Sequence, residues 1–296
     1  MAGFFVALIA VLELVGLGSW GPAMSLANHA ATKPAVSLPQ YQAVATPSGN
    51  FVAPTLTATG MIAIDADNGQ VLASKDPLTP RPIASVTKMF TLLVVLRDHS
   101  LNETVTIPKL PTYETGAVLL NASAGAKFKL EDLVKAALIP SDNDAADSLA
   151  IYDAGSISAF TAKMNALMTN WQITGLHFSS ADGLTDTNNN ASPEALAKAA
   201  RLLLTNQAIR TITDTSATTI KDQSGQVYQL NTSNELLQTP GFYGIKTGYT
   251  PVAGQCLVAL AKVHGHNVIS VILGSQDRFG ETKTLINAIS EGYSWQ

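Results

Sequence analysis

An apolar run that follows a short polar segment is the feature that most constrains the fold of this chain. Residues 89–96 read MFTLLVVL, which presents apolar side chains in nearly every direction when it is wound into a helix. Such a helix belongs in a core, because a surface helix keeps a polar face. The rest of the chain must therefore cover this helix on all of its sides.

A serine and a lysine stand at the start of this buried helix. Ser85 precedes Lys88 by three positions, so the two side chains share one helical face and can meet. A lysine in such surroundings either finds partners or has a pKa far below its usual value of about 10.4. A neutral amine beside a hydroxyl is a base beside a nucleophile. The alternative is that Lys88 snorkels to solvent, since an S-x-x-K pair alone occurs often by chance.

Composition and charge narrow the class of protein. The chain has 296 residues, of which 46% are hydrophobic and 14% are charged, as in globular proteins with a large core. Its net charge is −4 and no basic stripe is visible, so we expect no nucleic-acid partner. The single cysteine, Cys256, excludes an intramolecular disulfide and a cysteine-cluster metal site. His264 and His266 share a predicted turn without a third ligand, and we predict no metal and no cofactor.

The N-terminal segment is similar to an export signal. Residues 4–17 are strongly apolar apart from Glu13, and small residues follow. This pattern predicts a signal peptide or an uncleaved anchor over residues 1–27, with action outside the cytoplasm and membrane contact through this segment alone. Residues 28–59 are rich in Ala, Pro, Ser and Thr without periodicity, which is typical of a linker. One folded domain is expected over residues 60–296, with regular structure beginning at its first residue.

Secondary-structure patterns place strands at both ends of this domain and helices between them. Alternating or continuous apolar stretches predict strands, and apolar residues spaced three and four apart predict amphipathic helices. Besides the helix at Ser85, the predicted strands are 61–65, 70–74, 217–220, 226–230, 256–263 and 267–274, and the predicted helices are 130–139, 141–152, 157–170, 193–204 and 280–293. We expect one sheet assembled from both ends of the chain, in a mixed α/β (α+β) fold.

Two further polar clusters follow the S-x-x-K pair. Residues 140–146 read PSDNDAA, and residues 243–250 read YGIKTGYT. Taken separately, the first is typical of a helix N-terminus and the second of a strand that ends in a turn. Together they give the order S-x-x-K, S-x-N, K-T-G. This triplet resembles the active-site motifs of penicillin-binding proteins and class A β-lactamases.

The finer resemblance is to the low-molecular-mass penicillin-binding proteins that act as D-alanyl-D-alanine carboxypeptidases, serine peptidase family S11. It is carried by residues 82–89 (PIASVTKM), 138–146 (LIPSDNDAA), 244–250 (GIKTGYT) and 253–259 (AGQCLVA). The resemblance covers about residues 60–294. It implies a β-lactamase/DD-peptidase-like fold, with an antiparallel sheet flanked by helices and a second, helical lobe.

The resemblance also implies acyl transfer on a peptidoglycan stem peptide that ends in D-Ala-D-Ala, with β-lactams as covalent inhibitors. Ser85 would attack the penultimate D-Ala carbonyl, and Lys88 would be the base that activates it. Asn143 would hold Lys88 and the substrate amide, and the backbone N–H groups of Ser85 and Tyr249 would form the oxyanion hole. The implied catalytic residues are Ser85, Lys88, Ser141, Asn143 and Lys246, and the implied substrate-binding residues are Thr247, Gly248, Tyr249 and Arg278.

The remaining roles come from the same resemblance. Ser141 would relay a proton towards the leaving amine, with help from Lys246. Lys246 and Thr247 would bind the terminal carboxylate of the peptide, a task that suits a cation and a hydroxyl. Arg278 would add to this carboxylate recognition.

Two alternatives stay open. A class A β-lactamase shares the triplet, but it needs a glutamate on a loop between the second and third motifs to drive deacylation. Glu194 opens a predicted helix and Glu235 lies in N-E-L-L, and neither matches that loop's E-x-x-L-N. The other alternative is a binding or regulatory relative without catalysis. Turnover separates the three interpretations. A carboxypeptidase releases D-Ala and is trapped by penicillin, a β-lactamase hydrolyses penicillin quickly, and a binding protein does neither.

Overall fold

The computed structural model describes residues 43–49, 51–114, 116–184 and 188–296. The predicted signal peptide or anchor over residues 1–27 lies outside the described residues and stays a prediction. Among the described residues, no helix combines the length and the apolar character needed to cross a bilayer.

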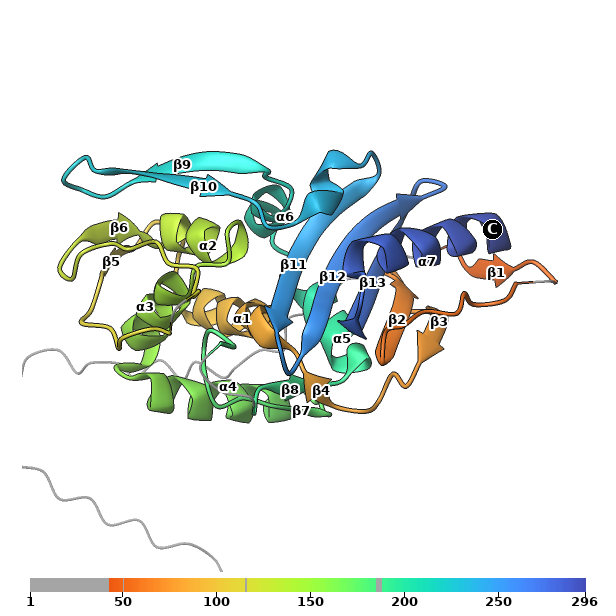
Figure 1. Ribbon diagram of the computed structural model, residues 1–296, viewed down its shortest axis with the longest axis horizontal. Helices are drawn as coiled ribbons and strands as arrows, with labels where there is room; N and C mark the ends of the chain where they lie inside the picture. Colours follow the sequence, from red (N-terminus) through yellow and green to blue (C-terminus); the bar gives the residue numbers. More distant parts are fainter. Residues whose placement is uncertain (1–42, 50, 115, 185–187) are drawn as a thin grey trace, which may run out of the picture. The chain divides into compact units, whose positions relative to one another are not determined.

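A five-stranded antiparallel sheet organises the described residues (Figure 1), with the strand order β11-β12-β13-β2-β3. The strands are β2 (Gly60–Asp65), β3 (Val71–Lys75), β11 (Phe242–Thr250), β12 (Gly254–Val263) and β13 (His266–Ser275). β2 pairs with β13, for example through Ile62 and Val271. The sheet is therefore assembled from both ends of the domain, which confirms the prediction.

Helices cover both faces of this sheet. α7 (Arg278–Gly292) packs on β12 and β13 from one side, and α5 (Pro193–Leu203) packs on β13 and β2 from the other. Because both faces are covered, β12 and β13 carry continuous apolar runs rather than an alternating pattern. Ser192 caps α5, since its hydroxyl accepts a bond from the Ala195 N–H, as expected for a Ser-Pro start.

The apolar helix of the first motif lies inside the helical lobe. It is α1 (Lys88–Asp98), and α2 (Leu130–Leu138), α3 (Asn143–Ala154), α4 (Ile157–Asn170) and α5 all contact it. Most of its apolar side chains have no exposed surface. The prediction of a helix covered by the rest of the chain is confirmed, and so is the antiparallel sheet flanked by helices with a helical lobe.

Two helices begin later than the motifs predicted. Ser85 lies in a 3₁₀ turn, η1 (Ala84–Thr87), and α1 follows this turn. Ser141 stands two residues before α3. At Ser141 the reason is the backbone, because φ there is +79° and a residue in the left-handed region cannot continue a right-handed helix. φ is also positive at Ala84, +49°, so no helix can run into Ser85 from before it.

Regular structure begins before Gly60, so that part of the sequence prediction is wrong. Strand β1 (Ala45–Pro47) pairs with β14 (Tyr293–Trp295), and its first residue is buried. The Ala58 N–H also donates to Glu281 Oε2 at 3.1 Å. A three-residue strand whose partner lies at the other end of the chain leaves no periodic pattern to detect.

Short elements complete the described part of the chain. They are β4 (Arg81–Pro82), β5 (Thr104–Thr106), β6 (Lys127–Lys129), β7 (Leu176–His177), β8 (Asn190–Ala191), α6 (Gln207–Thr213), β9 (Ala217–Lys221), β10 (Val227–Asn231) and η2 (Glu235–Gln238). The predicted strands at 217–220 and 226–230 are β9 and β10, which pair as a hairpin beside β5 and β6 (Figure 1). The Gln223 N–H donates to the Lys127 carbonyl at 2.9 Å and so ties the hairpin turn to β6.

Candidate active site

The first motif forms a tight turn against the sheet. η1 packs on β11, and their backbones come very close at Gly248. A Cβ atom at Gly248 would lie 2.7 Å from the Ile83 carbonyl oxygen and 3.1 Å from the Val86 side chain, so only glycine fits there. The K-T-G strand is thereby held beside Ser85, whose side chain is partly exposed.

Lys88 links three parts of the site although it is completely buried. Its Nζ donates to Ser85 Oγ at 3.0 Å, to Asn143 Oδ1 at 2.7 Å and to the Asp182 carbonyl oxygen at 2.8 Å. These acceptors match the three donors of an ammonium group. Burial lowers the pKa of Lys88 to about 8, against the field of several carboxylates that raises it. The amine therefore lies next to Ser85 and can accept a proton near neutral pH.

A second serine–lysine pair lies in the same site. Ser141 Oγ accepts a bond from Lys246 Nζ at 2.8 Å, and the same Nζ donates to the Thr247 carbonyl at 2.9 Å. Burial, together with the positive charges of Lys88 and Arg278, holds the pKa of Lys246 well below its ordinary value. The left-handed backbone of Ser141 costs on the order of 1–3 kcal/mol for a non-glycine residue, and such strain is concentrated at functional sites.

The predicted substrate-binding residues continue along β11. Thr247 Oγ1 and Ser233 Oγ are 2.6 Å apart. Tyr249 is 61% exposed, so a ligand can reach it. Arg278 donates from Nη1 to the Gly248 carbonyl at 2.9 Å, and its buried Nε has no hydrogen-bond partner among the described residues. All the predicted site residues thus lie together, because each contacts another site residue or is adjacent to one in the sequence.

Buried carboxylates near Lys88 are the part of the site that the sequence motifs did not predict. Burial raises the pKa of Asp142 and of Asp147 to about 7. Asp147 is 2% exposed and lies one helical turn after Asn143, on the same face of α3. Its Oδ2 accepts a bond from the Tyr113 hydroxyl at 2.7 Å. The four-residue spacing from Asn143 is the one sequence signal that could have indicated it.

The two histidines of the predicted turn contact the C-terminal segment, and the single cysteine is buried. In the part of the chain that the structure describes, no three His, Cys, Asp or Glu side chains are placed to hold a metal ion. His264 Nε2 lies 2.7 Å from the Ser290 carbonyl, and His266 stacks on Trp295. Burial raises the pKa of Cys256 to about 11, so its thiol is protonated at neutral pH.

Comparison with known proteins agrees with this geometry. The family model of D-alanyl-D-alanine carboxypeptidase, peptidase S11, matches residues 47–277. A D-alanyl-D-alanine carboxypeptidase of Streptomyces sp. strain K15 is 33% identical over 248 residues, which are 78% of this chain and 85% of that protein. The carboxypeptidase DacB2 of Mycobacterium tuberculosis is 30% identical over 239 residues, which are 80% and 81% of the two chains.

Solved structures give the same result. The crystal structure of the Streptomyces K15 DD-transpeptidase superposes with a TM-score of 0.74 at 31% identity, over 80% of this chain and 98% of that one. The residues that the family model matches, 47–277, include all three motifs. The chain belongs to the peptidase S11 family of D-alanyl-D-alanine carboxypeptidases.

Proposed function

We propose that the protein is a serine carboxypeptidase that removes the terminal D-Ala from peptidoglycan stem peptides through an acyl-enzyme on Ser85. The observation that carries the proposal is the 3.0 Å contact between Ser85 Oγ and the Nζ of the fully buried Lys88. The relatives named above are D-alanyl-D-alanine carboxypeptidases, which supports a peptide ending in D-Ala-D-Ala as the substrate.

Acylation begins at this serine–lysine pair. Lys88 in its neutral form takes the proton of Ser85 as the oxygen attacks the penultimate D-Ala carbonyl. The backbone N–H groups of Ser85 and Tyr249 stabilise the resulting oxyanion, a role supported by the close packing of β11 on η1. Asn143 keeps Lys88 in place through the 2.7 Å bond to its Nζ.

The second pair acts on the leaving group. Ser141 passes a proton to the nitrogen of the departing D-Ala, and Lys246 replaces that proton through its 2.8 Å bond to Ser141 Oγ. Lys246 and Thr247 bind the carboxylate of the terminal D-Ala. An anion bound there raises the pKa of Lys246, so that this lysine carries the proton that it passes to Ser141. Arg278 supports the site by holding the Gly248 carbonyl.

Water then releases the acyl-enzyme, and this step separates carboxypeptidases from β-lactamases. A class A β-lactamase needs a glutamate beside the nucleophile. Glu194 instead pairs with Lys198 on the surface of α5, and Glu235 is exposed in η2. β-Lactams are therefore expected to acylate Ser85, and the resulting acyl-enzyme is expected to be hydrolysed slowly.

We also propose that the enzyme acts outside the cytoplasm. The peptidoglycan substrate lies there, and the apolar N-terminal segment predicts export. Whether this segment is cleaved or retained as an anchor can be read from the N-terminal sequence of the protein isolated from its cells.

The proposal is tested by intact mass spectrometry after penicillin, followed over time, with release of D-Ala measured in parallel. The wild type should gain the mass of one penicillin, keep it for many minutes, and release D-Ala from a D-Ala-D-Ala peptide. Ser85→Ala should show neither the penicillin adduct nor D-Ala release. Ser74→Ala, at an exposed position of β3, is the matched control and should behave like the wild type.

Each other outcome would contradict the proposed mechanism or favour another functional class. An adduct on Ser85→Ala would remove Ser85 as the nucleophile. An adduct that disappears within seconds would favour the β-lactamase. A wild type without adduct and without D-Ala release would favour the non-catalytic relative.

A further inference from the structure

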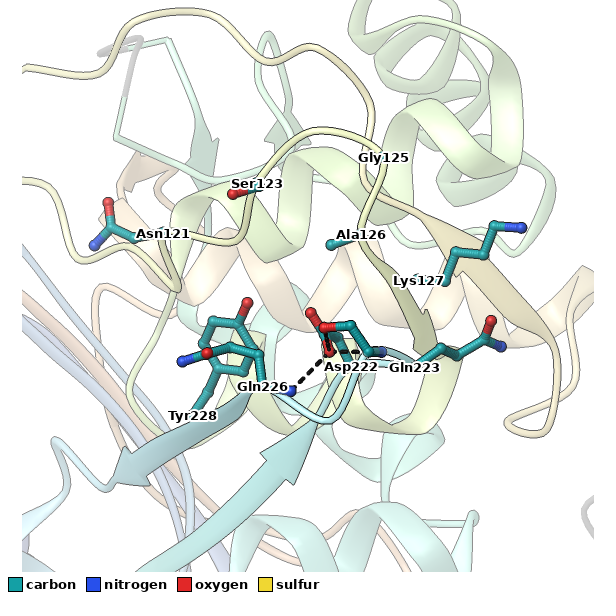
Figure 2. A pocket seen from close by; sticks show the side chains of 10 residues that line it. Asn121, Ser123, Gly125, Ala126, Lys127, Asp222, Gln223, Gln226 and Tyr228 are labelled. Carbon is teal, nitrogen blue, oxygen red and sulfur yellow. Dashed lines mark hydrogen bonds between the residues drawn. The ribbon is translucent and has the colours of Figure 1, made fainter.

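A polar pocket lies outside the catalytic residues. Its volume is about 710 Å³, within the range of small-molecule sites, and it opens between the turn of the β9–β10 hairpin and residues 121–127 (Figure 2). The residues whose polar groups line it are Asn121, Ser123, Lys127, Asp222, Gln223, Ser224, Gln226 and Tyr228. Neither the motifs nor the proposed mechanism uses any of them.

The lining carries one positive and one negative side chain, Lys127 and Asp222, and so suits a neutral ligand that is rich in hydroxyl and amide groups. The carboxamides of Asn121, Gln223 and Gln226 each offer donors and an acceptor. Tyr228 stands on the hairpin wall beside Gln226 (Figure 2), and its ring packs on Phe128 with 5.3 Å between the ring centroids. This contact fixes the tyrosine in place, so that it offers the pocket an ordered ring edge and hydroxyl.

The charged group of the hairpin wall is Asp222. Its Oδ1 accepts bonds from the Ser224 hydroxyl at 2.6 Å, the Ser224 N–H at 2.9 Å and the Gln226 N–H at 3.0 Å. The Ser224 hydroxyl first, and then the backbone N–H groups, hold the pKa of Asp222 below its usual range. An ionised carboxylate accepts strong bonds from hydroxyl groups.

One wall of the pocket is joined to the second motif. The Asn121 N–H donates to Asp144 Oδ2 at 2.8 Å, and the Asn143 N–H donates to the Val118 carbonyl at 2.8 Å. Val118 and Asn121 are three positions apart, a distance of at most about 10 Å. Since Asn121 also contacts Asp144, the neighbour of Asn143, the pocket begins within about 10 Å of the residue that holds Lys88.

The other wall is joined to the third motif. β10 runs from Tyr228 towards Ser233, whose Oγ is 2.6 Å from Thr247 Oγ1. Five positions of extended strand span about 17 Å. In a stem peptide, about four residues separate the bond that Ser85 attacks from the sugar, which is about 14 Å in extended form. The sugar end of a bound stem peptide can thus reach the pocket.

We propose that this pocket binds the N-acetylated amino sugar to which the stem peptide is attached. The acetamido group and the hydroxyls of such a sugar match the carboxamides, the phenol and the carboxylate of the lining. The enzyme then favours stem peptides that are still attached to a saccharide over free peptides. This inference rests on the proposed function, because it takes the stem peptide as the substrate.

The kinetic test compares kcat/KM for D-Ala release from N-acetylmuramyl pentapeptide and from the same pentapeptide without the sugar. The wild type should favour the muramyl substrate about tenfold, the value of one or two good hydrogen bonds. Asp222→Asn and Gln226→Ala should each remove most of this preference without changing kcat/KM for the free pentapeptide. Asparagine at position 222 keeps a side-chain oxygen that can accept the hydrogen bonds of the hairpin turn. Gln229→Ala, whose side chain lies on the other face of β10, is the control and should keep it.

The proposal would be overturned if the wild type had equal kcat/KM for the two substrates. It would also be overturned if the variants lowered kcat/KM for the muramyl and the free pentapeptide equally. A binding arm keeps this result separate from the proposed function. Muramyl dipeptide, which lacks D-Ala-D-Ala, should shift the NMR signals of Gln226 and Tyr228 in the wild type, and Gln226→Ala should weaken its binding several-fold. Absence of these shifts would refute the pocket even in an active carboxypeptidase. Shifts without any D-Ala release would keep the pocket and refute the carboxypeptidase.

Discussion

Replacing Asp147 by asparagine tests how the pKa of Lys88 is set. Asparagine keeps the volume of the side chain and can still accept the bond that the Tyr113 hydroxyl donates, but it removes a buried negative charge. That charge favours the protonated form of Lys88. The other acids that do so are Asp182, Asp142 and Asp144. The substitution should therefore lower the pKa of Lys88 and make this base available at lower pH.

Geometry gives the size of the effect. Asp147 lies four positions after Asn143, about 6 Å along α3, and Asn143 Oδ1 is 2.7 Å from Lys88 Nζ. At about 7 Å, two unit charges interact by about 2.4 kcal/mol for an effective dielectric of 20 and by about 0.6 kcal/mol for one of 80. A value between these corresponds to about one pKa unit. If the pKa of Lys88 falls from about 8 to about 7, its neutral fraction at pH 7 rises from about a tenth to about half in molecules whose Asp147 is ionised. Those are about half of the wild-type molecules at pH 7, because burial raises the pKa of Asp147 to about 7.

The assay is the second-order rate of acylation by a fluorescent penicillin between pH 6 and pH 10. Asp147→Asn should react up to about twofold faster than the wild type at pH 7 and equally fast at pH 9.5, where Lys88 is neutral in both proteins. Asp76→Asn, which removes an exposed carboxylate paired with Arg81, should leave the profile unchanged. If the midpoint of the pH profile of acylation stays in place or moves to higher pH in Asp147→Asn, Asp147 does not act on Lys88 through its charge.

Three further predictions concern the base, the packing of the third motif and the buried acids. Lys88→Ala should keep the circular dichroism spectrum and lower penicillin acylation by about 10²–10⁴-fold; unchanged acylation would remove Lys88 as the base. Gly248→Ala should destabilise the fold by about 1–3 kcal/mol in thermal melts and slow acylation, because its Cβ would lie 2.7 Å from the Ile83 carbonyl. The melting temperature should fall between pH 5 and pH 7.5, since burial raises the pKa of Asp142 and Asp147 to about 7 and the folded state therefore binds their protons more tightly than the unfolded chain. Calorimetry that shows a rise over this range would contradict that sign.

The parts of the fold and site that rest on short-range patterns could be predicted from the sequence. The S-x-x-K spacing brings Ser85 and Lys88 together because three residues make about one turn, whether the turn is 3₁₀ or α-helical. The apolar run after Lys88 had to be covered, and four other helices cover it. The strands of the central sheet were visible because both of its faces are buried and its strands are continuously apolar.

The parts that could not be predicted depend on the backbone or on distant partners. The third acceptor of Lys88 is the carbonyl of Asp182, an atom that every residue carries, so no residue type indicates it. The left-handed conformation of Ser141 is imposed by its surroundings, because serine has no preference for it. The bond between Tyr113 and Asp147 joins positions that are 34 residues apart, and neither belongs to a motif.

The contacts of Lys88 explain how one buried lysine can be both satisfied and reactive. Its three acceptors are a hydroxyl, a carboxamide and a backbone carbonyl, all of them uncharged. A carboxylate in direct contact would favour the ammonium form by several kcal/mol and would hold the pKa near its ordinary value. In this site the acids act through their field, so burial prevails and the pKa falls only to about 8. We therefore predict that Lys88 can act as the proposed base only with asparagine, and not aspartate, at position 143, and Asn143→Asp should slow acylation at pH 7 although it preserves size and shape.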